Sequence, residues 1–183
     1  GLGYLLAASA LPLRDAELMA ADRAMGLDWR ALLEEFLRWP ALMVLLNFAY
    51  ASMGYQIVLA PLLFFLGDGR RPAVLVLAWA LALSVTTAIF PFAPALGGFL
   101  HLAIERAEVP QIWVGASWQY AEIFHRAREG TDLLLDQTDL DGLITFPSFH
   151  AAVAILMAWA LWPIRALRWP AAIWNALMWV SSI

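Results

Sequence analysis

Residues 39–67 read WPALMVLLNFAYASMGYQIVLAPLLFFLG and carry no charged side chain. A helix needs about 20 apolar residues to cross the hydrocarbon core of a bilayer, and an ionised group near its middle is costly. The stretch is long enough to cross once with some tilt. It therefore predicts a membrane-spanning helix.

Three further runs also lack aspartate, glutamate, lysine and arginine: residues 72–104, 142–164 and 169–183. They predict a second span, a third span, and a fourth that is cut short. Residues 1–13 suit either the end of an earlier span or an interfacial segment. We therefore expect an all-α, polytopic transmembrane helical bundle of about four to five membrane helices. Residues 1–183 would form a single domain that is incomplete at both ends.

The composition agrees with a membrane protein and excludes several other classes. Of the 183 residues, 63% are hydrophobic and only 14% are charged, and the mean hydropathy is +0.71. The 11 basic residues are all arginine, are spread along the chain and are outnumbered by 15 acids, so no surface for nucleic acid is expected. Because cysteine is absent, the chain has no disulfide framework and no thiolate metal site.

Two polar regions separate the apolar runs. Residues 14–38 mix both charge signs with regularly spaced apolar residues, which predicts short amphipathic helices at the membrane interface. Gly26 is expected to end the first of these helices and Asp28 to cap the second. Residues 105–141 carry eight acids against three arginines and predict a loop with short helices.

The short connections between runs indicate an orientation. Arg70 and Arg71 lie in one connection and Arg165 and Arg168 lie in another, and single crossings would put both on the same side of the bilayer. That basic side is expected to be cytoplasmic, and the acidic loop and the start of the third span then face the opposite compartment. Three tryptophans near expected helix ends fit an interfacial aromatic belt: Trp39, Trp162 and Trp169.

The segment that carries chemistry is GLITFPSFHAA, residues 142–152. Pro147 has its φ preset for a first helical turn, so the third span is expected to begin there. Unpaired N–H groups at a helix start, with Ser148 and His150 beside them, favour an anion such as phosphate. Ser148 would donate a hydrogen bond and His150 would protonate a leaving oxygen. Taken alone, the pattern equally allows a packed or interfacial histidine.

The stretch FPSFHAA at 146–152 resembles the Pro-Ser-x-His element of the type-2 phosphatidic acid phosphatase superfamily. It is most similar to the inositol phosphorylceramide synthase-like branch of inositolphosphotransferases and their bacterial relatives. Upstream, Asp22 with GLDW at 26–29 resembles that branch's Asp-x-x-x-Gly-x-Asp-Trp pattern, and WNALM at 174–178 resembles its last helix. The branch also keeps polar residues on the helix that here carries Asn47, Tyr50 and Gln56. The resemblance covers nearly the whole chain.

This resemblance implies phosphoryl-group chemistry through a phosphohistidine, with no metal and no cofactor. A second histidine, oriented by an aspartate four residues later, would attack phosphorus while His150 acts as the general acid and Ser148 binds phosphate oxygens. No His-x-x-x-Asp follows Trp174. That element is therefore expected beyond residue 183, and the fragment as given is expected to be inactive.

Other residues of the chain fit the same site less well. The superfamily's first element, a lysine followed seven residues later by Arg-Pro, has no match, and Arg71-Pro72 is expected on the cytoplasmic side. Arg126 and Arg128 are the best-placed candidates for binding the substrate phosphate, although ion pairs with nearby glutamates are the favoured alternative. His101 and His125 are expected to be ordinary loop or interface residues because their spacing fits no metal site.

The function expected of the intact protein is therefore that of an integral-membrane, multi-pass enzyme. It would be a lipid phosphatase or phosphotransferase acting on a phospholipid-type substrate from the extracytoplasmic leaflet. The alternative is a non-catalytic membrane module that binds lipid or a partner subunit and keeps the motif as a helix-start packing feature. A transporter is less favoured because no internal repeat or broken-helix pair is visible.

Overall fold

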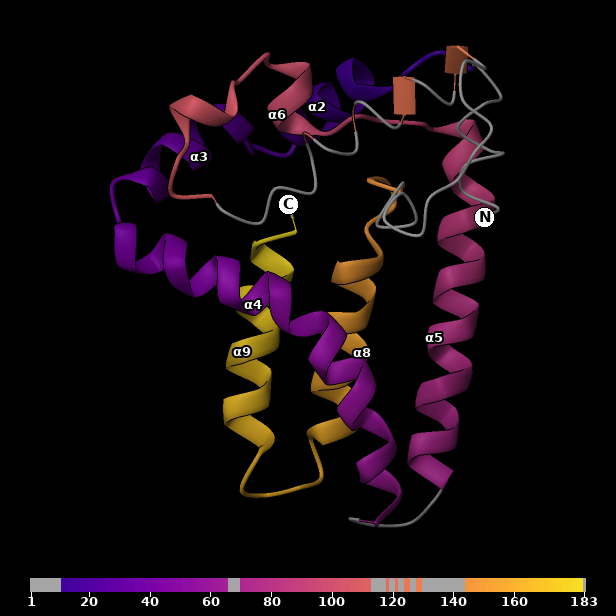
Figure 1. The fold of residues 1–183 in the computed structure, drawn as a ribbon. Helices are drawn as coiled ribbons and strands as arrows, with labels where there is room; N and C mark the ends of the chain where they lie inside the picture. Colours follow the sequence, from indigo (N-terminus) through magenta and orange to yellow (C-terminus); the bar gives the residue numbers. More distant parts are fainter. Residues whose placement is uncertain are drawn as a thin grey trace. The chain divides into compact units, whose positions relative to one another are not determined.

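The computed structural model describes residues 11–65, 70–112 and 144–182, together with residues 118, 121, 124, 125, 128 and 129. All regular structure among these residues is helical, which confirms the all-α expectation (Figure 1). By internal packing the chain divides into two compact units. The first unit comprises Gly1–Met43 and Thr86–Pro147, and the second comprises Val44–Val85 and Ser148–Ile183.

The described part of the first unit begins with two short helices, α2 (Asp15–Ala24) and α3 (Trp29–Leu37). Between them, Gly26 adopts a left-handed φ of 83°, and the amide of Leu27 donates to the carbonyl of Asp22 at 2.9 Å. This hydrogen bond closes a Schellman turn, which a glycine forms without steric cost. The prediction that Gly26 ends the first helix is confirmed.

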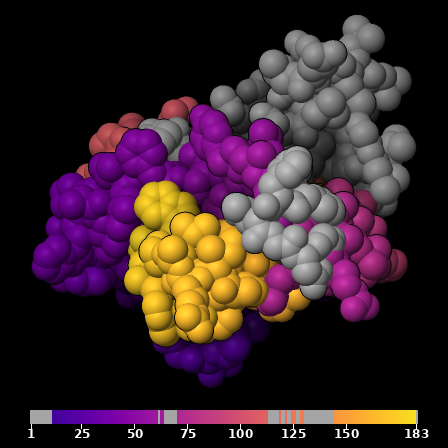
Figure 2. Space-filling model, turned by 90° about the horizontal axis from the view of Figure 1, so that it is seen from below, coloured from indigo at the N-terminus to yellow at the C-terminus, as the bar shows by residue number. Residues whose placement is uncertain are grey.

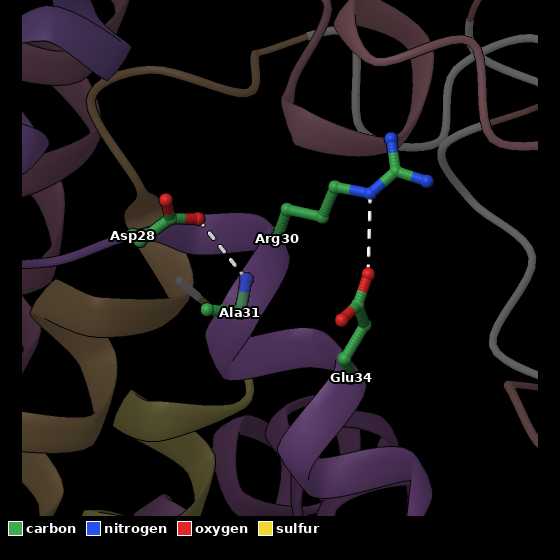
Figure 3. Close-up of polar contacts among 4 residues, drawn as sticks. All are labelled: Asp28, Arg30, Ala31 and Glu34. Carbon is green, nitrogen blue, oxygen red and sulfur yellow. Dashed lines mark hydrogen bonds and ion pairs between the residues drawn. The ribbon is translucent and has the colours of Figure 1, made fainter.

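Helix α3 is capped as its sequence predicts. The carboxylate of Asp28 accepts a hydrogen bond from the amide of Ala31 at 3.0 Å (Figure 3). Arg30 pairs with Glu34, one turn further along the helix, at 3.2 Å. An aspartate at this position satisfies one of the amides that a helix start leaves unpaired.

The remaining described helices of the first unit are short: η2 (Phe90–Phe92), α6 (Gly98–His101) and η3 (Arg106–Glu108). Trp29 of α3 packs edge-on against Phe99 of α6, with 4.8 Å between ring centroids. A Cβ atom on Gly98 would lie 2.4 Å from the nearest carbon of the Trp29 ring, so only glycine fits there. The aromatic pair borders a small core formed by Leu33, Ile104 and Val109.

A buried carboxylate joins two parts of the first unit. Asp15, the first residue of α2, accepts hydrogen bonds from the amides of Leu96 (2.9 Å) and Gly97 (2.8 Å). A buried charge is tolerable when it is hydrogen-bonded in this way. The sequence analysis did not single out Asp15, because the sequence gives no sign that the first acid of an amphipathic helix is buried.

The second unit holds most of α4 (Pro40–Leu59), the turn η1 (Ala60–Phe65), most of α5 (Arg70–Ile89), α8 (Phe149–Leu161) and α9 (Arg168–Val180). Helices α8 and α9 lie side by side as an antiparallel hairpin (Figure 1). The core of this unit is built from apolar side chains of all four helices: Ala49, Leu75, Val153, Ala154, Met157 and Met178.

Two of the expected spans are long and apolar enough to cross a bilayer, Pro40–Leu59 and Arg70–Phe92. The run at 72–104 does not continue as one helix, because Pro91, Pro94 and two glycines follow the end of α5. Helices α8 and α9 have 13 residues each. At 1.5 Å per residue each is about 20 Å long, which is shorter than the hydrocarbon core. Within the described residues, two helices are thus long and apolar enough to cross a membrane, and the expected number of four to five spans stays a prediction.

Candidate functional site

The Pro-Ser-x-His element lies at the start of α8, where Ser148 is the N-cap residue. Its hydroxyl oxygen accepts a hydrogen bond from the amide of Ala151 at 3.2 Å. The prediction that the helix begins at Pro147 is wrong by two residues: the first helical residue is Phe149. The reason is that a capping serine needs an extended backbone, here with ψ of 113°, and therefore stands outside the helix that it caps.

The capping bond leaves part of the Ser148 hydroxyl available. A hydroxyl that accepts one hydrogen bond still has its own proton to donate. A phosphate oxygen near the helix start would therefore meet the Ser148 proton, the neighbouring amides and the positive end of the helix dipole. A helix start with this local structure can bind an anion.

His150 lies in the first turn of α8, and its ring is stacked on the ring of Tyr50 from α4. The ring centroids are 4.0 Å apart and the two planes differ by 12°. Two nearly parallel rings in van der Waals contact restrict rotation of the imidazole about its χ angles. The sequence identifies Tyr50 only as a polar residue of the apolar run at 39–67, because nothing in the sequence pairs residue 50 with residue 150.

A chain of polar side chains joins α4 to α9 next to the apolar core. The indole of Trp174 donates to the hydroxyl of Ser52 at 2.9 Å, and that hydroxyl donates to the carbonyl of Ala49 at 2.6 Å. The amide of Gln56 donates to the same hydroxyl at 3.0 Å and lies 3.6 Å from the sulfur of Met178. These contacts fix the last helix against the helix that carries Tyr50. Ser52 was missed from the sequence, where a serine in an apolar run has no distinguishing pattern.

Two asparagines of the second unit are buried, Asn47 on α4 and Asn175 on α9. The side-chain N–H of Asn175 donates to the carbonyl of Ala171 at 2.9 Å. Its side-chain oxygen is buried and has no hydrogen-bond partner among the described residues. Buried oxygens without a hydrogen-bond partner are uncommon in proteins. A hydrogen-bond donor placed beside the Asn175 oxygen would therefore be stabilised.

Two arginines, Arg126 and Arg128, are expected from the sequence to bind the substrate phosphate. Arg126 lies outside the described residues. Arg128 belongs to the first unit, where its guanidinium donates to the carbonyl of Leu11 and lies 5.2 Å from the centre of the Phe124 ring. His101 at the end of α6 and His125 are both exposed.

Arg71 lies at the far end of α8 from His150. Its guanidinium donates to the carbonyl of Trp159 at 3.1 Å and sits 4.4 Å over the ring of that residue. Trp159 follows His150 by nine residues, about 13.5 Å along a helix. The Arg71-Pro72 pair therefore does not take the place of the superfamily's first element beside the histidine.

The upstream pattern from Asp22 to Trp29 has local structural roles in the described residues. Gly26 makes the left-handed turn, Asp28 caps α3, and Trp29 covers Gly98. These roles explain the spacing of the pattern without a catalytic function.

Comparison with known proteins gives one family. The profile described as the PAP2 superfamily matches residues 16–183, which include the whole of the cluster around Ser148 and His150. Neither a curated protein nor a solved structure matches the chain. Members of this superfamily are generally phosphatases, so the match indicates an enzyme of the phosphatase or phosphotransferase type. Because the matched region covers most of its length, the chain belongs to the PAP2 superfamily.

Proposed function

We propose that the intact protein is an integral-membrane lipid phosphatase or phosphotransferase that works through a phosphohistidine and needs no metal. The observation that carries the proposal is the combination of Ser148 as helix cap and His150 stacked on Tyr50 at one helix start, in a chain of the PAP2 superfamily. The motif at residues 146–152 resembles that of the inositol phosphorylceramide synthase-like branch, and this resemblance suggests transfer to a lipid hydroxyl as well as hydrolysis.

The proposed reaction has two steps. In the first, an imidazole nitrogen of the second histidine, expected beyond residue 183, forms a bond to phosphorus while the bond from phosphorus to the leaving oxygen breaks. His150 gives its proton to that oxygen as it leaves. In the second step, the oxygen of water or of an alcohol forms a bond to phosphorus while the bond from phosphorus to the histidine nitrogen breaks, and His150 takes up the proton of the attacking group. Ser148 and the adjacent amides of α8 hold the phosphoryl oxygens and stabilise their charge in both steps.

The membrane placement rests on α4 and α5. Both helices carry large apolar side chains that are exposed, with Val58 at 75% and Leu77 at 60%. Exposed apolar surface along two helices of spanning length is what a lipid environment permits. In this proposal the lipid tail of the substrate stays in the bilayer and its head group meets the start of α8 on the extracytoplasmic side. The arginine-containing turns are then cytoplasmic.

The decisive test replaces His150 by alanine in the full-length protein. Loss of a general acid is expected to lower turnover of a lipid phosphate or phosphoinositide by about 10²–10⁴-fold. His101→Ala is the matched control, because this histidine is exposed and lies in the other unit. Membrane insertion should be unchanged in both variants. Equal turnover by the two variants would overturn the role of His150.

The stack on His150 allows a finer test of the same site. Tyr50→Leu is expected to lower turnover about tenfold by freeing the imidazole, whereas Tyr50→Phe keeps the stacked ring and most of the activity. Tyr55→Leu on the same helix is the control, since Tyr55 is 74% exposed. Residues 1–183 contain three histidines, so the ring-current shift of the His150 signals can be followed by NMR of this chain. It should disappear in Tyr50→Leu and persist in Tyr50→Phe.

The orientation can be tested by cysteine labelling, because residues 1–183 contain no cysteine. A single cysteine introduced near Gly130 should react with an impermeant thiol reagent added outside the cell. One introduced near Arg168 should react only after the membrane is opened. The reverse pattern would overturn the proposed sidedness.

The capping role of Ser148 supports a second candidate, a non-catalytic membrane module that binds lipid or a partner subunit. In such a module the hydroxyl would serve only to start α8. The coding frame past Ile183 discriminates the two candidates. A His-x-x-x-Asp within the next few dozen codons supports the enzyme, and a stop codon supports the module.

A further inference from the structure

Arginine and tryptophan gather at the end of the second unit where α8 turns into α9. Trp159 and Trp162 lie one helical turn apart at the end of α8, and Trp169 lies at the start of α9. The rings of Trp162 and Trp169 are 5.3 Å apart, edge to face. The turn lies at the surface, as the orange and yellow atoms of Figure 2 show. The exposed fractions of Trp162 and Trp169 are 42% and 62%.

Two guanidinium groups are fixed on these indoles. Arg71 of α5 sits over Trp159 at 4.4 Å, and Arg168 sits over Trp162 at 5.5 Å. Arg71 donates to the carbonyl of Trp159, and Arg168 donates to the carbonyl of Trp162 at 3.3 Å. The stacking places two cations from different helices on adjacent turns of one helix face.

These contacts leave donors of both groups available. A guanidinium has five N–H donors, and each of these contacts uses one. The Nε atom of Arg71 is buried and has no hydrogen-bond partner among the described residues. A buried donor of this kind is stabilised by an added acceptor.

The charge at this end is not balanced within the second unit. Its sequence contains one acid, Asp68, against four arginines: Arg70, Arg71, Arg165 and Arg168. The formal net charge of the unit is therefore +3. An excess of positive charge beside exposed indoles favours a partner that is both anionic and partly apolar.

We propose that this tryptophan–arginine end binds the phosphate head group of an anionic phospholipid. The planar guanidinium groups match the geometry of phosphate oxygens, and the indoles lie at the level of the head groups. Basic positions between membrane helices on the cytoplasmic side bind such lipids. The inference rests on the membrane placement proposed above, but it concerns the end of α8 opposite to His150. An acidic protein segment is the competing occupant and is one outcome of the test.

The test reconstitutes the full chain in nanodiscs of equal parts phosphatidylcholine and phosphatidylglycerol. Native mass spectrometry then measures which lipid stays bound after the disc is removed. Wild type is expected to retain phosphatidylglycerol preferentially. Arg71→Gln with Arg168→Gln should reduce this preference by about fivefold for each arginine removed, and added salt should weaken it further.

The matched control is Arg30→Gln with Arg38→Gln, which removes the same charge from the first unit. It should leave the lipid preference unchanged. If the variant with both Arg71→Gln and Arg168→Gln fails to insert, the single variant Arg165→Gln replaces it, because Arg165 is an exposed arginine of the same turn. It should lower the preference for phosphatidylglycerol about fivefold.

Four outcomes would overturn the inference. Equal retention of the two lipids by wild type would do so alone, without bearing on catalysis at His150. A control variant that loses the preference as strongly would show an effect of net charge only. Preferential binding of an acidic peptide over phosphatidylglycerol would assign the surface to a protein partner. A chain that does not enter nanodiscs would overturn the membrane placement as well.

Discussion

The two units differ in net charge and in the kind of side chain that they expose. The first unit has fourteen acids against seven arginines in its sequence, a formal net charge of −7, whereas the second has a net charge of +3. Ion pairs lie along the helices of the first unit, such as Arg14 with Glu17 at 2.7 Å. The second unit instead exposes apolar side chains along α4 and α5.

This contrast shows how far local rules explain each unit. Helix caps, a glycine turn and hydrogen-bonded carboxylates account for the first unit, as they would in a protein surrounded by water. In the second unit, the specific contacts join helices that are far apart in sequence, such as Tyr50 with His150. The candidate chemistry is therefore placed by long-range packing, and the following variants compare matched positions in the two units.

The largest effect is expected for a pair of buried polar residues. Asp15→Ala removes the acceptor of the Leu96 and Gly97 amides and should lower the stability of the first unit by about 2–4 kcal/mol. Asn175→Leu, of similar shape, should change the stability of the second unit by no more than about 1 kcal/mol, because the Asn175 oxygen has no described partner. Hydrogen exchange resolved by segment measures the stability of each unit. A similar loss of stability in the two variants would contradict this difference between the units.

The next effect concerns two glycines. Gly98→Ala places a methyl group within the ring of Trp29 and should destabilise the first unit by about 1–3 kcal/mol. Gly54→Ala on α4 meets no atom within 4 Å and should stabilise the second unit by about 0.5–1 kcal/mol. Thermal unfolding of the two variants gives the signs. A stabilising Gly98→Ala would contradict the packing described for Trp29.

A smaller effect on stability is expected at two helix caps. Asp28→Ala and Ser148→Ala each remove one capping bond, at 3.0 Å and 3.2 Å, and should each cost about 1 kcal/mol. Only Ser148→Ala should also lower turnover, because its hydroxyl is proposed to bind phosphate. Equal turnover by these two variants would reduce Ser148 to a structural cap.

The smallest effect is expected at an exposed ion pair. The Arg14 guanidinium, hydrogen-bonded to Glu17, holds the pKa of that carboxyl below its usual value. The contribution of the pair is therefore present above the usual pKa of glutamate and fades as the pH falls through the lowered value. Arg14→Gln should return the Glu17 pKa towards that of a free glutamate with almost no change in stability. A carbon-detected NMR titration measures the shift, and an unchanged pKa would contradict the pairing.

Much of the fold could be predicted from charge gaps and turn residues. The all-α class, the two long apolar helices and the break at Gly26 with the cap at Asp28 follow from local sequence and are confirmed. The expected number of spans stays a prediction, since two helices of the described residues are long and apolar enough to cross a membrane. A charge gap gives only an upper limit to helix length. Prolines and glycines after α5, and a serine cap before α8, shorten the helices inside the gaps.

The candidate site could be predicted only in part. Ser148 and His150 stand out in the sequence because the short segment from Pro147 to His150 combines a hydroxyl, an imidazole and an expected helix start. The partners of that element are separated from it by about a hundred residues, and no local pattern encodes such a pairing. Tyr50 against His150 and Ser52 against Trp174 are contacts of this kind.

The sequence by itself determined the apolar character and the superfamily of this protein, because hydrophobicity, charge and a short motif are properties of neighbouring residues. The tertiary structure alone decided which ring restrains His150 and which buried polar atoms lack partners. It also decided that Arg71 belongs to the opposite end of α8. The physical reason is that packing selects among the many contacts that a set of apolar helices allows, and that choice depends on side chains from several helices at once.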